Sequence, residues 1–186
     1  MSDVEVTFNS DQDRVIKLNE LGGKDNRFVK LQEEMGELSD ALLEGDDGKI
    51  AEEGIDVLLM LQSIFADHFP DSYAITTALK DWFVVSHELS TANNVQQAPM
   101  LYRAGSFLKL TMHVGKVASG FQIVTKVHSS QYKVKQGFSD GLRPMFDNIL
   151  DATLHVVDLI CSTGMPITEL QQIHTNKMNK WEAVAK

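Results

Sequence analysis

Apolar residues recur at intervals of three and four along most of the chain, which is the spacing of one face of an α-helix. The clearest stripe consists of Phe28, Leu31, Met35, Leu38 and Leu42. No segment alternates apolar and polar residues between hairpin turns, as the strands of a sheet would. The pattern therefore predicts an all-α fold, an antiparallel helical bundle.

Helix breakers divide this pattern into seven predicted helices within a single all-α domain over residues 1–186. The breakers are Gly22-Gly23, Gly45, Pro70, Asn93-Asn94 and Gly164-Met165-Pro166. We expect Ser10 to cap the first helix and Asp71 the fourth, because both are good N-cap residues. Residues 124–141 are the least regular, with 131–134 extended or looped, and the sixth helix is expected over 144–163.

Two stretches of the chain resemble each other. Residues 28–42 align without a gap on residues 107–121, with Phe, Lys, Leu and Gly at matching places, and Ile55–Leu58 matches Val157–Ile160. These matches predict repeat-like halves, a metal-binding half over 25–92 and a degenerate half over 99–183. Chance similarity between amphipathic helices is the alternative explanation.

Composition narrows the class of protein. In a chain of 186 residues, 43% hydrophobic residues suffice for one core, and a net charge of −9 argues against a protein that binds nucleic acid through its phosphates. One cysteine, Cys161, excludes a disulfide within the chain and fits a reducing compartment. Without an apolar run of bilayer length or a leader at Met1, we expect a cytoplasmic protein with no nucleic-acid or membrane partner.

The negative charge is concentrated between residues 33 and 56, which contain ten acids and one base, Lys49. At 100° per residue, Glu34 borders the apolar stripe of its helix and Glu37 lies on the same side, whereas Glu33 points toward solvent. Glu34 and Glu37 are therefore predicted to face a groove between helices.

The helix over 47–68 is apolar around almost its whole circumference, which predicts a buried helix. It also carries Glu53 and Asp56, which lie three residues apart and face one side. Buried carboxylates are costly unless cations neutralise them, and hard divalent cations such as Mg²⁺ prefer oxygen ligands. The absence of His and Cys among these acids argues against zinc, and the absence of a Glu-x-x-His pair argues against a di-iron centre. Acids on solvated helix edges are the alternative.

The arrangement Glu34-x-x-Glu37, fifteen residues, Glu53-x-x-Asp56 resembles the E-x-x-E…E-x-x-D signature of the all-α nucleoside triphosphate pyrophosphatases. That superfamily includes MazG-like proteins, dimeric-type dUTPases and phosphoribosyl-ATP pyrophosphohydrolases. The resemblance implies that these four acids are catalytic and hold Mg²⁺. It also implies a hydrolase that converts a (d)NTP to a nucleoside monophosphate and pyrophosphate, with Glu37 or Glu33 accepting a proton from the attacking water.

The resemblance implies substrate-binding residues as well. Lys30 lies on the same side of its helix as Glu34, and Asn176, Lys177 and Lys180 belong to a segment similar to the Asn/Lys-rich helix end that serves phosphates in such proteins. For each of these residues a plain surface role is the alternative. The base is expected to stack on an aromatic side chain, with core packing as the alternative for each candidate: Phe8, Trp82 and Trp181.

In the second half, the positions of the four acids are occupied by His113, Lys116, His155 and Asp158. We therefore expect a pseudo-dimer with no second metal cluster, and a homodimer of the whole chain. Two other functions stay open at this point. One is phosphoribosyl-ATP pyrophosphohydrolase activity, and the other is a non-catalytic helical module that binds a nucleotide or a protein.

Overall fold

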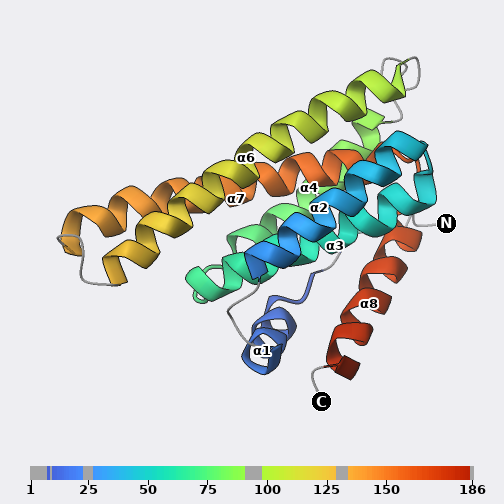
Figure 1. Ribbon diagram of the computed structural model, residues 1–186. Coiled ribbons are helices and arrows are strands. Elements are labelled where there is room, and N and C mark those ends of the chain that lie inside the picture. Colours follow the sequence, from blue (N-terminus) through green and yellow to red (C-terminus); the bar gives the residue numbers. More distant parts are fainter. Residues whose placement is uncertain (1–7, 9, 23–26, 91–97, 129–133, 185–186) are drawn as a thin grey trace.

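The computed structural model describes residues 8, 10–22, 27–90, 98–128 and 134–184. Within these ranges the chain is helical and contains no strand, which confirms the all-α prediction (Figure 1). The helices, in chain order, are α1 (Gln12–Gly22), α2 (Arg27–Glu44), α3 (Asp47–His68), α4 (Ala74–Ser90), α6 (Pro99–His128), α7 (Val134–Cys161) and α8 (Ile167–Val184). No helix among the described residues combines the length and the apolar character needed to cross a bilayer.

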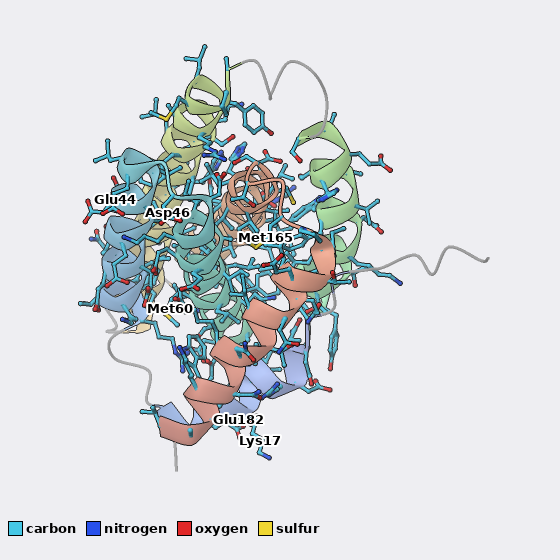
Figure 2. The ribbon with its side chains drawn as sticks, turned by 90° about the vertical axis from the view of Figure 1, so that its right-hand side faces the viewer. Lys17, Glu44, Asp46, Met60, Met165 and Glu182 are labelled. Atoms are coloured by element: carbon cyan, nitrogen blue, oxygen red, sulfur yellow. The ribbon has the colours of Figure 1, made fainter. Side chains whose placement is uncertain are left out.

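Helix α3 is the centre of the fold. It is buried on nearly every side, as its sequence predicted, and it packs against α1, α2, α7 and α8. Figure 2 shows α8 crossing in front of α3 and ending beside α1. The apolar positions of α3 are therefore buried, whereas Asp47, Lys49 and Glu52 are exposed and Glu53 and Asp56 are half-buried.

Turns and caps set the ends of the helices. Gly45 and Gly164 have φ values of +71° and +72°, which glycine adopts without strain. The carboxylate of Asp46 accepts a hydrogen bond from the backbone N–H of Lys49 and caps α3. Two predicted caps are wrong, because both helices begin later in the sequence. Asp11, not Ser10, caps α1 at 3.0 Å from Arg14 N, and the Oγ of Ser72, not Asp71, accepts from the first N–H of α4 at 3.4 Å.

The largest error in the helix prediction concerns residues 124–141. Helix α6 continues to His128, and α7 begins at Val134 rather than at Pro144, which lies inside the helix. The two helices pack along their length, and a Cβ added at Gly120 would meet the Gly141 carbonyl oxygen at 3.0 Å. This close packing outweighs the weak helix propensity of glycine and serine. Residues 129–133 and the predicted break at Asn93-Asn94 lie outside the described residues.

Candidate metal centre

The antiparallel hairpin of α2 and α3 brings together three of the four predicted acids. Glu34 and Glu37 come from α2 and Glu53 from α3, and one carboxylate oxygen of each lies within 4.8 Å of the other two. Glu34 is buried, Glu53 is half-buried and Glu37 is exposed. The three acids therefore form a cluster that is closed toward the core and open toward solvent.

The fourth predicted acid, Asp56, lies one helical turn beyond Glu53 and has a different partner. Its carboxylate forms an ion pair with the ammonium of Lys177 from α8. Both side chains are largely buried, with exposed fractions of 14% for Asp56 and 18% for Lys177. Asp56 thus connects the α2–α3 hairpin to α8.

Lys30 supplies a second cation at the cluster. Its Nζ atom lies 2.8 Å from Glu34 Oε1 and 3.1 Å from Glu33 Oε1. Glu34 and Asp56 therefore each form an ion pair with one lysine. Within the described residues, no ion pair with a lysine or arginine is found for Glu37 or Glu53.

Burial raises the pKa values of three of these carboxyl groups. For Glu34 and Glu53, loss of hydration is the main cause, and the negative charges of neighbouring acids raise the pKa further. The pKa of Asp56 is also raised, chiefly by burial, although Lys177 acts in the opposite direction. Burial lowers the pKa of Lys177, but the hydrogen bond to Asp56 and the negative charges of Asp56, Glu53 and Glu52 together outweigh burial. The pKa is therefore raised, and the ammonium is held in its charged form.

The ligand set suits a hard divalent cation, because all three clustered groups are carboxylates. Oxygen atoms bound to one Mg²⁺ lie at most about 4.2 Å apart, twice the usual bond length. The observed limit of 4.8 Å is only slightly larger, so small side-chain rotations bring the three oxygens to one ion. The residues present therefore fit Mg²⁺.

A pocket of about 360 Å³ lies between α8 and α3, at the Lys177 side chain that pairs with Asp56. Its lining consists of residues from the end of α8 and one residue from α3: Glu52, Ile173, Asn176, Lys177, Asn179 and Lys180. Three of the four predicted substrate-binding residues thus lie at one pocket, whereas Lys30 lies at the acids. Because Lys177 both lines the pocket and binds Asp56, the pocket and the candidate metal ligands are directly connected.

The sequence analysis did not assign Glu52 and Asn179 to the site. Glu52 is adjacent to Glu53 in sequence, and Asn179 lies three residues after Asn176, so one face of α8 carries both asparagines. That spacing was the available signal for Asn179. The position of Glu52 depends on how α8 crosses α3, which no local pattern records.

The aromatic residues proposed to stack on a base are not among those that line the pocket. Phe8 is only 1% exposed and stacks on Phe83 with ring centroids 3.8 Å apart, so it is part of the core. Trp82 and Trp181 are half-buried and pack against that core.

His174, in the segment that carries the pocket residues, is buried against Phe8, and burial lowers its pKa to about 4. It is therefore a neutral core residue and not a phosphate ligand.

No protein-family model, curated protein or solved structure matches this chain. The interpretation of the site therefore depends on the spacing of the acids in the sequence and on the geometry described above.

The corresponding positions on α6 and α7 have different chemistry. The rings of His113 and His155 lie 5.6 Å apart, and His113 Nδ1 lies 2.8 Å from Asn148 Oδ1. Asp158 accepts a hydrogen bond from Ser86 at 2.7 Å. Burial lowers the pKa of His155, which keeps its imidazole neutral near pH 7.

Proposed function

We propose that this protein is a Mg²⁺-dependent nucleoside triphosphate pyrophosphohydrolase that releases a nucleoside monophosphate and pyrophosphate. The observation that carries this proposal is the convergence of Glu34, Glu37 and Glu53 oxygens within 4.8 Å of one another. A pocket with lysine and asparagine donors is linked to the fourth acid, Asp56, through Lys177. Carboxylates and phosphate-binding donors at adjoining positions are what a metal-dependent phosphoanhydride hydrolase requires.

In this proposal Glu34, Glu37, Glu53 and Asp56 hold the metal. When bound, Mg²⁺ supplies charge neutralisation for the phosphates and lowers the pKa of a bound water. The burial of Glu34 and the half-burial of Glu53 fix these ligands in position, because packed side chains have few alternative rotamers.

Lys177 has two partners available in this arrangement. In the free protein its ammonium neutralises Asp56, and it also faces the pocket beside Asn176 and Lys180. The same ammonium can therefore contact a substrate phosphate without a large movement. The amide of Asn176 and the exposed ammonium of Lys180 add hydrogen-bond donors for the phosphate chain.

Glu37 is the better of the two proposed proton acceptors. It belongs to the cluster and is exposed to solvent, from which an attacking water would come. Glu33 lies outside the cluster and binds Lys30 at 3.1 Å. We assign the base role to Glu37 on these grounds.

We place this activity in the cytoplasm. Cys161, the single cysteine of the sequence, is a free and buried thiol, and burial raises its pKa to about 12. A thiol of this kind is inert and is compatible with a reducing compartment.

The test measures pyrophosphate release from a panel of nucleotides, with Mg²⁺ and with a chelator. The panel contains the common dNTPs, dUTP and phosphoribosyl-ATP. We expect turnover of at least one nucleoside triphosphate that stops when the metal is removed. Turnover of phosphoribosyl-ATP alone would support phosphoribosyl-ATP pyrophosphohydrolase activity. Binding without turnover of any nucleotide would support a non-catalytic module and contradict the proposal.

A further inference from the structure

The two asparagines that line the pocket on α8 are held by hydrogen bonds from residues outside its lining. Asn179 Oδ1 accepts a hydrogen bond from Arg14 Nη2 at 2.6 Å. Asn176 Oδ1 accepts one from Gln172 Nε2 at 2.9 Å. An amide side chain carries one acceptor oxygen and one nitrogen with two N–H donors. Because both oxygens already have donors, the N–H groups are the part of each amide that remains for a ligand of the pocket.

The orientation of the Asn179 amide is determined by the chemistry of Arg14. A guanidinium group has N–H donors and no acceptor, so only the amide oxygen can form a hydrogen bond with it. The opposite orientation would bring the N–H groups of both side chains together and lose the hydrogen bond of 2.6 Å. Gln172, by contrast, can donate or accept, so it fixes the Asn176 amide less strictly. Arg14 therefore decides which atoms of Asn179 a ligand meets.

Arg14 is itself held in place by α8 and by the start of its own helix. Its Nε atom donates to Glu182 Oε1 at 2.6 Å, and its side chain is 25% exposed. Its backbone N–H donates to the Asp11 carboxylate at 3.0 Å. The hydrogen bond to Glu182 raises the pKa of Arg14, so the guanidinium stays charged. Figure 2 shows Glu182 at the end of α8, beside α1, and this junction is where the guanidinium contacts Asn179.

The charges around the pocket largely offset one another. Lys177 is paired with Asp56, and the lining contains the acid Glu52 as well as Lys180. In the free protein the two lysines alone therefore give an anion little net attraction. Neutral N–H donors add to this attraction, since hydrogen bonds to an ionised oxygen are roughly twice as strong as those between neutral groups. The direction of the asparagine amides is thus important for anion binding.

We propose that Arg14 is a positioning residue for phosphate binding, because it presents the N–H groups of Asn179 to the pocket. The ionised oxygens of a phosphate chain are hydrogen-bond acceptors. They match N–H donors and would be repelled by an amide oxygen in the same place. The inference rests on the proposed function for the source of the anion, which is the phosphate chain of the nucleotide. It also gives α1 a role that the sequence analysis did not assign.

The first experiment measures the Kd for pyrophosphate by calorimetry in the presence of a chelator, so that metal takes no part. Arg14→Met should weaken binding by at least about fivefold, because the Asn179 amide is no longer oriented. Arg14→Lys, which keeps a side chain with donors only, should bind within about twofold of the wild type. The matched control is Lys17→Met, which removes one exposed positive charge from the same helix and should leave the Kd unchanged.

Three results of this experiment would overturn the proposal. They are a wild type that does not bind pyrophosphate, an Arg14→Met variant that binds as the wild type does, and equal losses in Arg14→Met and Lys17→Met, which would indicate a general effect of charge.

The second experiment is a double-mutant cycle that asks whether Arg14 acts through Asn179. Asn179→Ala should weaken pyrophosphate binding, and adding Arg14→Met to that variant should weaken it no further. Asn179→Asp can still accept from Arg14 but presents an oxygen to the pocket, so its loss should be at least as large as that of Asn179→Ala. Losses that add in the double variant would mean that Arg14 acts on the anion by another route, and would contradict the proposal.

Turnover kinetics separate this inference from the proposed function. With a nucleotide that is hydrolysed, Arg14→Met should raise KM by at least about fivefold and leave kcat within about twofold, because the substituted group contributes to binding and not to the chemical step. If no nucleotide is hydrolysed but pyrophosphate binding depends on Arg14 through Asn179, the proposed function fails and the positioning role stands. If turnover occurs and Arg14→Met changes neither KM nor Kd, the positioning role fails and the proposed function stands.

Discussion

The helix pairs α2–α3 and α6–α7 carry different side chains at the positions that the predicted repeat aligns. On α2 and α3 these positions hold Glu34, Glu37, Glu53 and Asp56, and three of the four converge. On α6 and α7 they hold two histidines, a lysine and one aspartate: the two histidine rings lie 5.6 Å apart, and Asp158 Oδ2 lies 3.7 Å from His155 Nδ1.

The comparison shows two ways of placing polar groups at a helix junction. Imidazoles can be neutral, so they do not repel one another. His113 lies 2.8 Å from the Asn148 side-chain oxygen, and Asp158 accepts a hydrogen bond from Ser86 and lies 3.7 Å from His155. Carboxylates near pH 7 repel one another, and burial raises the pKa of Glu53 and Glu34 without removing that repulsion. Lys30 and Lys177 neutralise Glu34 and Asp56, and in the proposed function a bound cation would neutralise the remaining acids of the cluster.

The largest expected difference between the two junctions is in catalysis. Asp56→Asn should lower pyrophosphate release by more than about 100-fold, since even residues that only orient metal ligands contribute 10- to 100-fold. Asp158→Asn, at the corresponding position of α7, should leave the rate within about threefold, because Asp158 contacts Ser86 and His155 and not the cluster. Steady-state kinetics at saturating Mg²⁺ measures both.

Equal losses of activity in Asp56→Asn and Asp158→Asn would mean that the two junctions contribute alike to catalysis. Unchanged activity in Asp56→Asn would remove Asp56 from the proposed ligand set.

A second difference should appear in stability on addition of metal. Mg²⁺ at 100 times its dissociation constant stabilises a folded protein by about 3 kcal/mol, which corresponds to a rise in Tm of roughly 5–10 °C for a chain of this size. Glu53→Gln should abolish this rise, whereas His155→Gln should keep it. Differential scanning calorimetry with and without Mg²⁺ gives the comparison, and a rise that persists in Glu53→Gln would place the ion elsewhere.

The smallest expected difference is in how the free energy of unfolding changes with pH, and the direction of this change is opposite at the two junctions. The pKa of Glu53 is raised in the folded state, so without metal its contribution to stability is lost as pH rises above the ordinary carboxyl range. The pKa of His155 is lowered, so its contribution is lost as pH falls below 6.5. Each effect should be on the order of 1 kcal/mol.

Urea unfolding between pH 4.5 and 7.5 separates these two contributions. Glu53→Gln should flatten the change on the alkaline side, and His155→Gln should flatten the change on the acidic side. If the stability of both variants changes with pH as that of the wild type does, burial does not shift the pKa values of Glu53 and His155.

Much of the candidate site could be predicted from the sequence, because its main elements are local. Glu34 and Glu37 lie one turn apart on a helix whose buried stripe is obvious, and α3 is apolar around almost its whole circumference. The stripe of α2 faces α3 in the structure, and that contact turns two local patterns into one cluster. Helical periodicity and a short connecting turn at Gly45 were sufficient to predict that these acids lie close together.

Other features depended on contacts between distant parts of the chain. The lysine of the Asp56 ion pair is 121 residues away, and the sequence analysis assigned Lys177 to phosphates alone. The continuation of α7 through Pro144 depended on packing against α6, which local propensity does not contain. The two repeat-like halves stay a prediction.

By itself the sequence determined most of the helices, but not the helical course of 124–128 and 134–143. It also determined the apolar faces of α2 and α3 and the spacing that brings Glu34, Glu37 and Glu53 together on one helical hairpin. These properties follow from spacing along a helix of fixed geometry. Only the tertiary structure decided which cations lie beside the acids, that a pocket opens at Lys177, and that Arg14 contacts Asn179. The physical reason is that crossing angles and neighbours are set by side-chain packing among all the helices at once.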